Sequence, residues 1–291
     1  MITYRNITDN QNFVPTVQKG PFTVFEHQKD LSNDASSAAT AFFMYQMNVN
    51  RRQLLCELKD GNSIRTQAGA MQWIAGAVES DTGLGSGAKA IGGFLKGALK
   101  GAVTGESAVK PVYRGAGHVM LEPTYKHILL EEVSEWGPDG VVIDDGLFLA
   151  ADGALEEKVV VRKNLSSVLG GEGLFNLSFK GTGVLALESF SPREELFVFD
   201  LENDVLKIDG NMAIAWSGSL EFTVERSSKS LIGSMVNGEG LVNVYRGTGR
   251  VLMAPTVPGT TMAGGSAKEA AEGGAKGKAG VGGILESITK L

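Results

Sequence analysis

One short pattern occurs three times along this chain, and no other feature of the sequence constrains the fold as strongly. In each copy a Gly-Glu pair is followed by an aromatic residue, a basic residue, Gly-x-Gly and an apolar run. The Gly-Glu pairs begin at Gly105, Gly171 and Gly238, which lie 66 and 67 residues apart. A constant period of this length indicates a repeat architecture, in which each copy forms one structural unit.

A second pattern lies upstream of each copy, at residues 69–76, 146–153 and 210–218, where glycines enclose an apolar run. Trp73 and Trp216 are interpreted as matching positions of the first and third copies, where each ring fills interior volume. Two patterns in the same order in every copy predict three tandem units.

The period of the apolar residues predicts that these units are built from β-strands. From Leu220 to Glu225 apolar and polar residues alternate, as a strand with one solvated face requires. Residues 195–201 and 204–209 predict a further strand pair, which we expect to turn at Asn203 and Asp204. The sequence therefore predicts an all-β protein.

A glycine-rich insert at residues 80–104 distinguishes the first unit from the other two. Its apolar and basic residues fall on different sides of an amphipathic helix predicted at 89–103: Ile91, Phe94, Leu95 and Leu99 on one side, and Lys89, Lys96 and Lys100 elsewhere. This helix either packs on the β body or rests on a membrane surface. Packing is favoured, because three lysines attract anionic lipid only modestly.

Residues 67–73 (Gln-Ala-Gly-Ala-Met-Gln-Trp), residues 238–251 and the triplicated pattern together resemble the altered-inheritance-of-mitochondria (mitochondrial biogenesis) family, in its bacterial branch. The resemblance covers residues from about 40 to 256. It implies a fold like that of the tryptophan-RNA-binding attenuation protein, with three β-sandwich or short double-stranded β-helix units in a pseudo-threefold arrangement. It also implies a link to membrane organisation in mitochondrial members, and it brings no catalytic residues.

Five segments follow from the repeat. They are an N-terminal extension packed on the first unit (1–45), the first unit with its insert (46–124), the second unit (125–190), the third unit (191–256) and a flexible low-complexity tail (257–291).

The composition excludes several classes of function. A single cysteine, Cys56, rules out a disulfide framework and is expected to be a buried, inert thiol. Three scattered histidines predict neither a metal site nor a cofactor, and we expect no enzyme activity. The net charge of −6 makes nucleic acid an unfavourable partner. The first residues lack a signal-peptide pattern and no apolar run could span a bilayer, so we expect a cytoplasmic protein.

Two sets of repeated charged residues are candidate site residues. Arg114, Lys180 and Arg246 follow the repeated aromatic residue, and under threefold symmetry they would form a ring that binds an anion or a partner; solvated surface charge is the simpler interpretation. The carboxylates that follow the repeated glycine are expected to stabilise turns: Glu106, Glu172 and Glu239.

Two functions of different classes remain open. The first is a noncatalytic scaffold or interaction protein with an unknown protein partner, peripheral to a membrane in one version, and able to form homo-oligomers. The second is a regulatory protein that binds a small ligand or RNA in the clefts between its β units, which rests on analogy of fold.

Overall fold

The computed structural model describes residues 2–7, 9–59, 61–81, 110–144, 146–161, 175–209, 212–226 and 241–256. Sixteen strands, one α-helix and two short 3-10 helices, η1 (Val133–Trp136) and η2 (Arg193–Glu195), make up this part of the chain. The predicted all-β class is confirmed. The predicted tail at 257–291, the helix at 89–103 and the repeated Gly-Glu pairs lie outside the described residues.

The strands form two sheets, in which all pairings are antiparallel. The order in the first sheet is β1 (Phe13–Lys19), β2 (Phe22–His27), β3 (Arg52–Leu58), β6 (Val112–Leu121), β4 (Ser63–Thr66), β9 (Phe148–Asp152), β12 (Val184–Ser189) and β7 (His127–Glu132), with β5 (Met71–Asp81) also paired to β6. The order in the second sheet is β10 (Glu156–Val161), β11 (Phe175–Lys180), β8 (Val141–Ile143), β14 (Ala213–Ser217), β16 (Leu241–Met253) and β13 (Phe197–Asp209), with β15 (Glu221–Arg226) also paired to β16.

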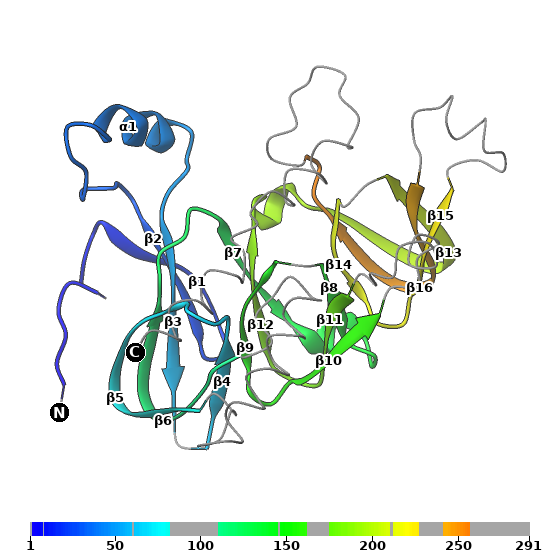
Figure 1. Cartoon of the computed structure of the whole chain (residues 1–291), viewed down its shortest axis with the longest axis horizontal. Coiled ribbons are helices and arrows are strands. Elements are labelled where there is room, and N and C mark those ends of the chain that lie inside the picture. Colours follow the sequence, from blue (N-terminus) through cyan, green and yellow to red (C-terminus); the bar gives the residue numbers. More distant parts are fainter. Residues whose placement is uncertain are drawn as a thin grey trace, which may run out of the picture.

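We name strands β3–β6 the first unit, β7–β12 the second and β13–β16 the third. Figure 1 shows them side by side in this order, with the first unit at the left and the third at the right. The sheets run across the unit boundaries, because β4 pairs with β9 and β8 pairs with β14. We call the β4–β9 pairing the first seam and the β8–β14 pairing the second seam. The segment boundaries and the pseudo-threefold arrangement, with its likeness to the attenuation protein, stay predictions.

A one-residue β-bulge recurs at the same place in all three units. The bulged residue is Gln72 in the pairing of β5 with β6, Leu149 in β9 with β12, and Ile214 in β14 with β16. The next residue in each strand pairs with Met120, Ala186 and Leu252, respectively. The strand-to-strand register of the repeat is therefore the same in each unit.

This register corrects the expectation that Trp73 and Trp216 match. Trp73 pairs with Met120, whereas Trp216 pairs with Val251, so the equivalent of Trp73 in the third unit is Ala215. Neighbouring positions of a strand face opposite sides of the sheet. Trp73 accordingly packs against the outer cluster of Phe13, Phe25, Leu55 and Met120, while Trp216 is buried among Val142, Leu220 and Tyr245.

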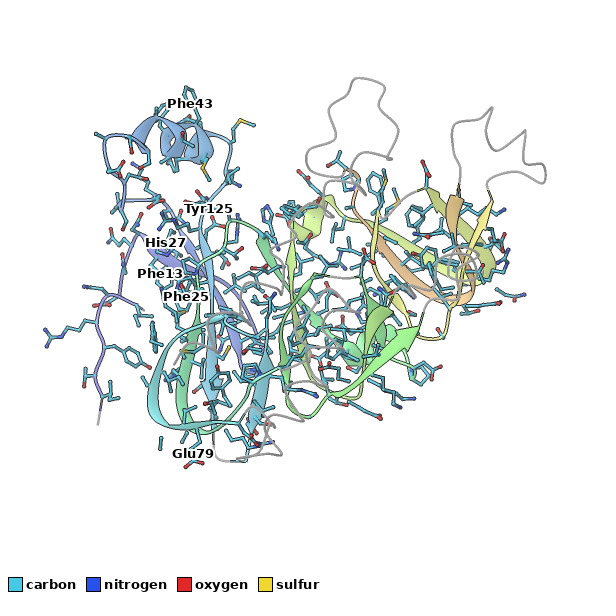
Figure 2. The ribbon with its side chains drawn as sticks, viewed as in Figure 1. Phe13, Phe25, His27, Phe43, Glu79 and Tyr125 are labelled. Atoms are coloured by element: carbon cyan, nitrogen blue, oxygen red, sulfur yellow. The ribbon has the colours of Figure 1, made fainter. Side chains whose placement is uncertain are left out.

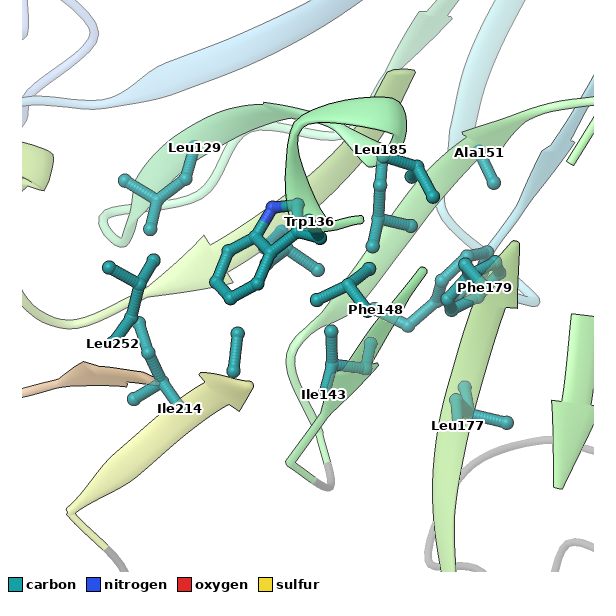
Figure 3. Close-up of a cluster of buried hydrophobic side chains, with 14 of the residues drawn as sticks. Leu129, Trp136, Ile143, Phe148, Ala151, Leu177, Phe179, Leu185, Ile214 and Leu252 are labelled. Atoms are coloured by element: carbon teal, nitrogen blue, oxygen red, sulfur yellow. The ribbon is translucent and has the colours of Figure 1, made fainter. Parts of the chain in front are cut away.

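The largest core lies inside the second unit and includes side chains from β14 and β16 of the third (Figure 3). Trp136 of η1 lies at its centre, and Phe148 and Phe179 stack with ring centroids 5.5 Å apart. The alternation of apolar residues in the strands places these side chains on one face, where burial contributes most of the stability. Because Ile214 and Leu252 belong to this core, the second and third units share apolar contacts as well as a seam.

The predicted turn at Asn203 and Asp204 is wrong, because β13 continues through both residues. β16 is long enough to pair with both halves of β13, and the register shifts between Leu201 and Asp204. Asn203 has φ +51°, a left-handed conformation that asparagine tolerates better than most residues. The extra residues are thus accommodated as a bulge instead of a hairpin turn.

The N-terminal segment adds a hairpin to the first unit, since β2 pairs with β3. Along the chain, α1 (Ala38–Gln46) lies between β2 and β3, and the sequence interpretation did not predict it. None of its residues is buried, and it stands apart from the strands in Figure 1.

Among the described residues, no helix has the length and apolar character that crossing a bilayer requires.

Candidate functional site

Both seams are held by the same backbone hydrogen bonds. In the first seam, the Gly153 N–H donates to the Ser63 carbonyl at 2.7 Å and the Gln67 N–H to the Leu149 carbonyl at 2.8 Å. In the second seam, the Gly218 N–H donates to the Gly140 carbonyl at 2.8 Å and the Asp144 N–H to the Ile214 carbonyl at 3.0 Å. The equal register means that differences between the seams come from their side chains.

A cleft of about 340 Å³ lies over the second seam, within the size range of small-ligand pockets. It is lined from five strands and their connections. The apolar lining is Val142, Val160, Trp216, Leu220 and Phe222, and the polar lining is Asp139, Glu156, Lys158, Asn176, Ser178 and Lys180. These residues come from both sides of the seam, so the cleft exists only because the second and third units share a sheet.

Aromatic rings form one wall of the cleft. Trp216 is only 3% exposed, and the Phe222 ring stacks on it with centroids 5.3 Å apart and planes at 24°. Tyr245, fully buried behind them, meets the Trp216 ring edge-on at 5.4 Å. This packing fixes the orientation of Phe222, whose partly exposed ring is the apolar contact surface of the cleft.

The charges at the rim are paired with each other. The Lys158 ammonium lies 2.9 Å from the Glu156 carboxylate, and the Lys180 ammonium 3.4 Å from that of Asp139. The hydrogen bond from Lys158 lowers the pKa of Glu156 below its ordinary value. Two cations and two anions surround the opening, so the rim can contact either sign of charge and the four side chains carry no net charge.

The first seam holds a charged cluster at the equivalent positions. Arg65 replaces Val142, Glu157 replaces Phe222 and Lys110 replaces Asn176, by the register of the strands. The Glu157 carboxylate lies 2.6 Å from the Lys110 ammonium and 3.9 Å from the Arg65 guanidinium. The Lys110 ammonium also sits 4.8 Å above the Phe148 ring. Long charged side chains thus occupy the space that an aromatic wall borders in the second seam.

A hollow of about 660 Å³ lies between the N-terminal hairpin and β7, and its lining is strongly charged. Arg52 pairs with Glu26 at 2.8 Å, and Arg193 with Glu131 at 2.9 Å. Burial is the main reason that the pKa of His127 is lowered there. Each ion pair lies within one wall of this hollow, and none of the residues that line it is Phe, Tyr or Trp, so we take the cleft with the aromatic wall as the candidate site.

The three repeated basic residues each lie beside a carboxylate of their own unit. Arg114 lies 3.8 Å from Asp81, Lys180 lies 3.4 Å from Asp139, and Arg246 lies 2.6 Å from Glu225. Lys180 alone of the three lines the cleft over the second seam. Their role as an anion-binding ring stays a prediction. The turn role of Glu106, Glu172 and Glu239 and the role of the 89–103 helix concern residues outside the described part.

Cys56 is a free, fully buried thiol, as expected, and burial raises its pKa strongly. His118 shares a hydrogen bond of 2.7 Å with the Tyr4 hydroxyl, and His27 one of 3.1 Å with the Gln53 amide oxygen. Within the described ranges no group of three or more His, Cys, Asp or Glu side chains is placed to hold a metal ion.

Sequence interpretation missed two features with functional potential. The first is the aromatic wall of the cleft, for which the only sequence signal was Phe222 at a place where the second unit has a glutamate. The second is α1, whose Phe43 is 66% exposed and points away from the strands (Figure 2). The run without charge from residue 35 to residue 50 was the signal for this helix.

Comparisons with known proteins give the family. The model of the family described as Mitochondrial biogenesis AIM24 matches residues 45–256, which contain every strand from β3 to β16. Uncharacterized protein M6_Spy0233 of Streptococcus pyogenes serotype M6 is 28% identical over 199 residues, covering 67% of this chain and 77% of that protein. The crystal structure of protein SPYM3_0169 from Streptococcus pyogenes is similar with a TM-score of 0.53 at 26% identity, over 72% of this chain and 89% of the other. This chain therefore belongs to the AIM24 mitochondrial biogenesis family.

Proposed function

We propose that this protein is a noncatalytic interaction protein whose recognition site is the cleft over the second seam. The observation that carries the proposal is the contrast between the seams. The same backbone register supports an ion cluster in one and an aromatic-walled cleft of about 340 Å³ in the other. A cleft that mixes apolar walls with a few polar groups is the usual form of a small-ligand site.

The noncatalytic part of the proposal is supported by the surroundings of the reactive side chains. A thiol acts as a nucleophile only when it is ionised and accessible, and Cys56 is neither. The carboxylates at the cleft, Glu156 and Asp139, are each paired with a lysine and are mostly exposed, whereas a carboxyl group that acts as a general acid is usually buried.

The cleft chemistry favours a ligand with a planar or branched apolar group. Phe222 and Val160 can contact such a group, while Asn176 and Ser178 line the adjacent polar surface. An acidic or sulfonated substituent could reach Lys158 or Lys180 by exchanging with the carboxylate that each lysine now contacts. Balanced charges at the rim favour a small molecule over RNA, because RNA affinity depends on uncompensated positive charge.

Binding of the fluorescent probe 8-anilinonaphthalene-1-sulfonate, which carries both an aromatic group and an anion, tests the proposal. We expect Phe222→Ala to weaken binding about tenfold, because a stacking contact of about 1.4 kcal/mol is lost. Phe43→Ala, which removes an exposed ring far from the cleft, is the matched control. Lys180→Gln should weaken binding more than Arg114→Gln, the same repeat position in the first unit. Equal binding by all four variants and the native protein would contradict the proposal.

A membrane surface is the second candidate partner, in a cytoplasmic protein that acts at the membrane periphery. The observation that favours it is the exposed apolar surface of α1 and of the residue that follows it, with Phe42 at 57%, Phe43 at 66% and Met47 at 75% exposure. Flotation of the full chain with vesicles of anionic phospholipid tests this candidate. We expect Phe42→Ser with Phe43→Ser, or deletion of residues 82–104, to reduce flotation; a native chain that stays unbound would contradict it.

A further inference from the structure

The two ends of the sheet array carry backbone groups equivalent to those that form the seams. In each seam, the later unit supplies a glycine N–H and the carbonyl of the bulge residue. These bond to a carbonyl and an N–H of the unit before it, and the two groups on each unit belong to residues four positions apart. The groups of the later unit belong to β9 or β14 and to the glycine that follows it, and those of the earlier unit lie at the two ends of β4 or β8. Each of these strands has a counterpart at an end of the array.

β5 of the first unit is the counterpart of β9 and β14. Gly76 follows the bulge residue Gln72 by four positions, as Gly153 follows Leu149 and Gly218 follows Ile214. Within the described ranges, β5 pairs only with β6, so its outer edge has no strand beside it. By register, the Gly76 N–H and the Gln72 carbonyl therefore correspond to the groups that the second and third units use, although Gly76 lies inside β5 with φ +102° and Gly153 and Gly218 lie in the turns that follow β9 and β14.

The C-terminal half of β13 is the counterpart of β4 and β8. Val205 pairs with Arg246 as Ser63 pairs with Arg114, and Asp209 lies four residues further on, as Gln67 does. In the part of the chain that the structure describes, β13 pairs only with β16. Figure 1 places β13 and β5 at opposite ends of the molecule.

We propose that this protein associates head to tail with a second copy of itself, and that β13 of one copy pairs antiparallel with β5 of the next. In the seam register, the Val205 carbonyl accepts from the N–H of Gly76 of the partner subunit. The Asp209 N–H donates to the carbonyl of Gln72 of the partner subunit. The new contact continues an interface that the chain already forms twice within itself. Because the joined surfaces differ, repetition gives a ring if the rotation closes and a filament if it does not.

The side chains at the β13 edge are compatible with this pairing. Lys207 occupies the position of Arg65, which lies within the first seam and donates to the Leu155 carbonyl across it. A lysine on an edge strand often opposes unwanted pairing. At the first seam, however, the strand that carries the equivalent cation, Arg65, is paired. Val205, close to Lys207 on β13, is apolar and 47% exposed.

Cysteine cross-linking tests the register directly. Ile64 and Asp152 lie directly opposite each other in the first seam, and their backbone groups point away from it. Leu206 corresponds to Ile64, and Ala75 corresponds to Asp152. Such pairs bring side chains close enough for a disulfide. We expect Leu206→Cys with Ala75→Cys to give disulfide-linked dimers and larger species that reductant dissolves. Leu206→Cys with Val78→Cys, three residues out of register, is the matched control. The native Cys56 is buried and is common to both variants.

Sedimentation velocity at increasing concentration gives an independent measure. We expect the native chain to form species above the monomer and Lys207→Pro, which removes an N–H from the edge, to remain monomeric with a native circular dichroism spectrum. If that variant does not fold, the cysteine pair decides. A native protein that is monomeric at every concentration and gives no cross-link overturns the proposal. A disulfide within one monomer also overturns the proposal. A monomer whose β5 and β13 edge amides resist hydrogen exchange overturns it too, because in both cases the chain covers its own edges.

Discussion

The two seams show how one backbone interface can serve two purposes. Both join neighbouring units with the same pairs of hydrogen bonds, between 2.7 and 3.0 Å long. Over the paired strands of the first seam lie Arg65, Lys110 and Glu157. Over those of the second seam lie Val142 and Phe222, with Asn176 beside them. Hydrogen bonds of the backbone position the units, and the side chains above them decide whether the space is filled or left as a cleft.

Under the proposed function, this difference separates stability from recognition. Ionic side chains at the first seam contact each other and Phe148, so the surface is closed by the chain itself. At the second seam the aromatic side chains pack inwards on Tyr245, and the outward face of Phe222 stays partly exposed. A repeat protein can thus keep one unit-to-unit junction as structure and use the other as a binding site without changing its fold.

The largest effect is expected where the aromatic wall meets the core. Trp216→Ala removes a ring that is 3% exposed and packs against Phe222 and Tyr245. We expect it to lower the free energy of unfolding by about 3–5 kcal/mol, as large-to-small substitutions of buried aromatic residues do. Urea unfolding followed by circular dichroism measures this.

Trp73→Ala is the control for that substitution, because Trp73 is only half-buried and packs on the outer face of the first unit. A smaller loss, about 1–3 kcal/mol, is expected for it. If both variants lost the same free energy, the deeper burial of Trp216 would add nothing to stability, and the expected difference between the two tryptophans would be wrong.

The sequence predicted the class of fold, but it did not predict the cleft. Alternation from Leu220 to Glu225 predicted β15, and the structure confirms that strand. The tryptophan match failed by one residue, because Trp73 lies three residues before Gly76 and Trp216 lies two before Gly218, and neighbouring strand positions face opposite sides of the sheet. The turn expected at Asn203 is a bulge because strand length and pairing partner decide the conformation there, and neither is local. The cleft gathers residues from Asp139 to Phe222 across a seam, and no spacing in the sequence records that contact.

A moderate effect is expected at the first seam. The Glu157 side chain is 18% exposed and lies between two cations, of which Lys110 is 11% exposed. Glu157→Gln leaves those cations without the carboxylate, and we expect the free energy of unfolding to fall by about 1–3 kcal/mol. Glu225→Gln, which breaks the more exposed pair with Arg246, should lower it by about 0–1 kcal/mol. The same loss in both variants would mean that the charged cluster at the first seam contributes no more to stability than a surface ion pair does.

The smallest effect concerns the rim of the second seam. The hydrogen bond from Lys158 holds the pKa of the Glu156 carboxyl below its ordinary value of 4.5. Because the folded pKa lies below the unfolded one, the pair contributes stability that is present above pH 4.5 and is lost as the pH falls through the lowered folded pKa. Carboxyl chemical shifts followed by NMR during an acid titration measure the pKa of Glu156 directly.

Lys158→Gln should return the pKa of Glu156 towards its ordinary value, whereas Lys207→Gln, on a strand that does not line the cleft, should leave it unchanged. Protonation of Glu156 also releases Lys158 from its partner, so an anionic probe should bind the cleft more tightly as the pH falls through this range, provided the fold is intact. A probe affinity that stays constant while Glu156 titrates would show that Lys158 does not contact the probe, and would limit recognition to the aromatic wall and Lys180.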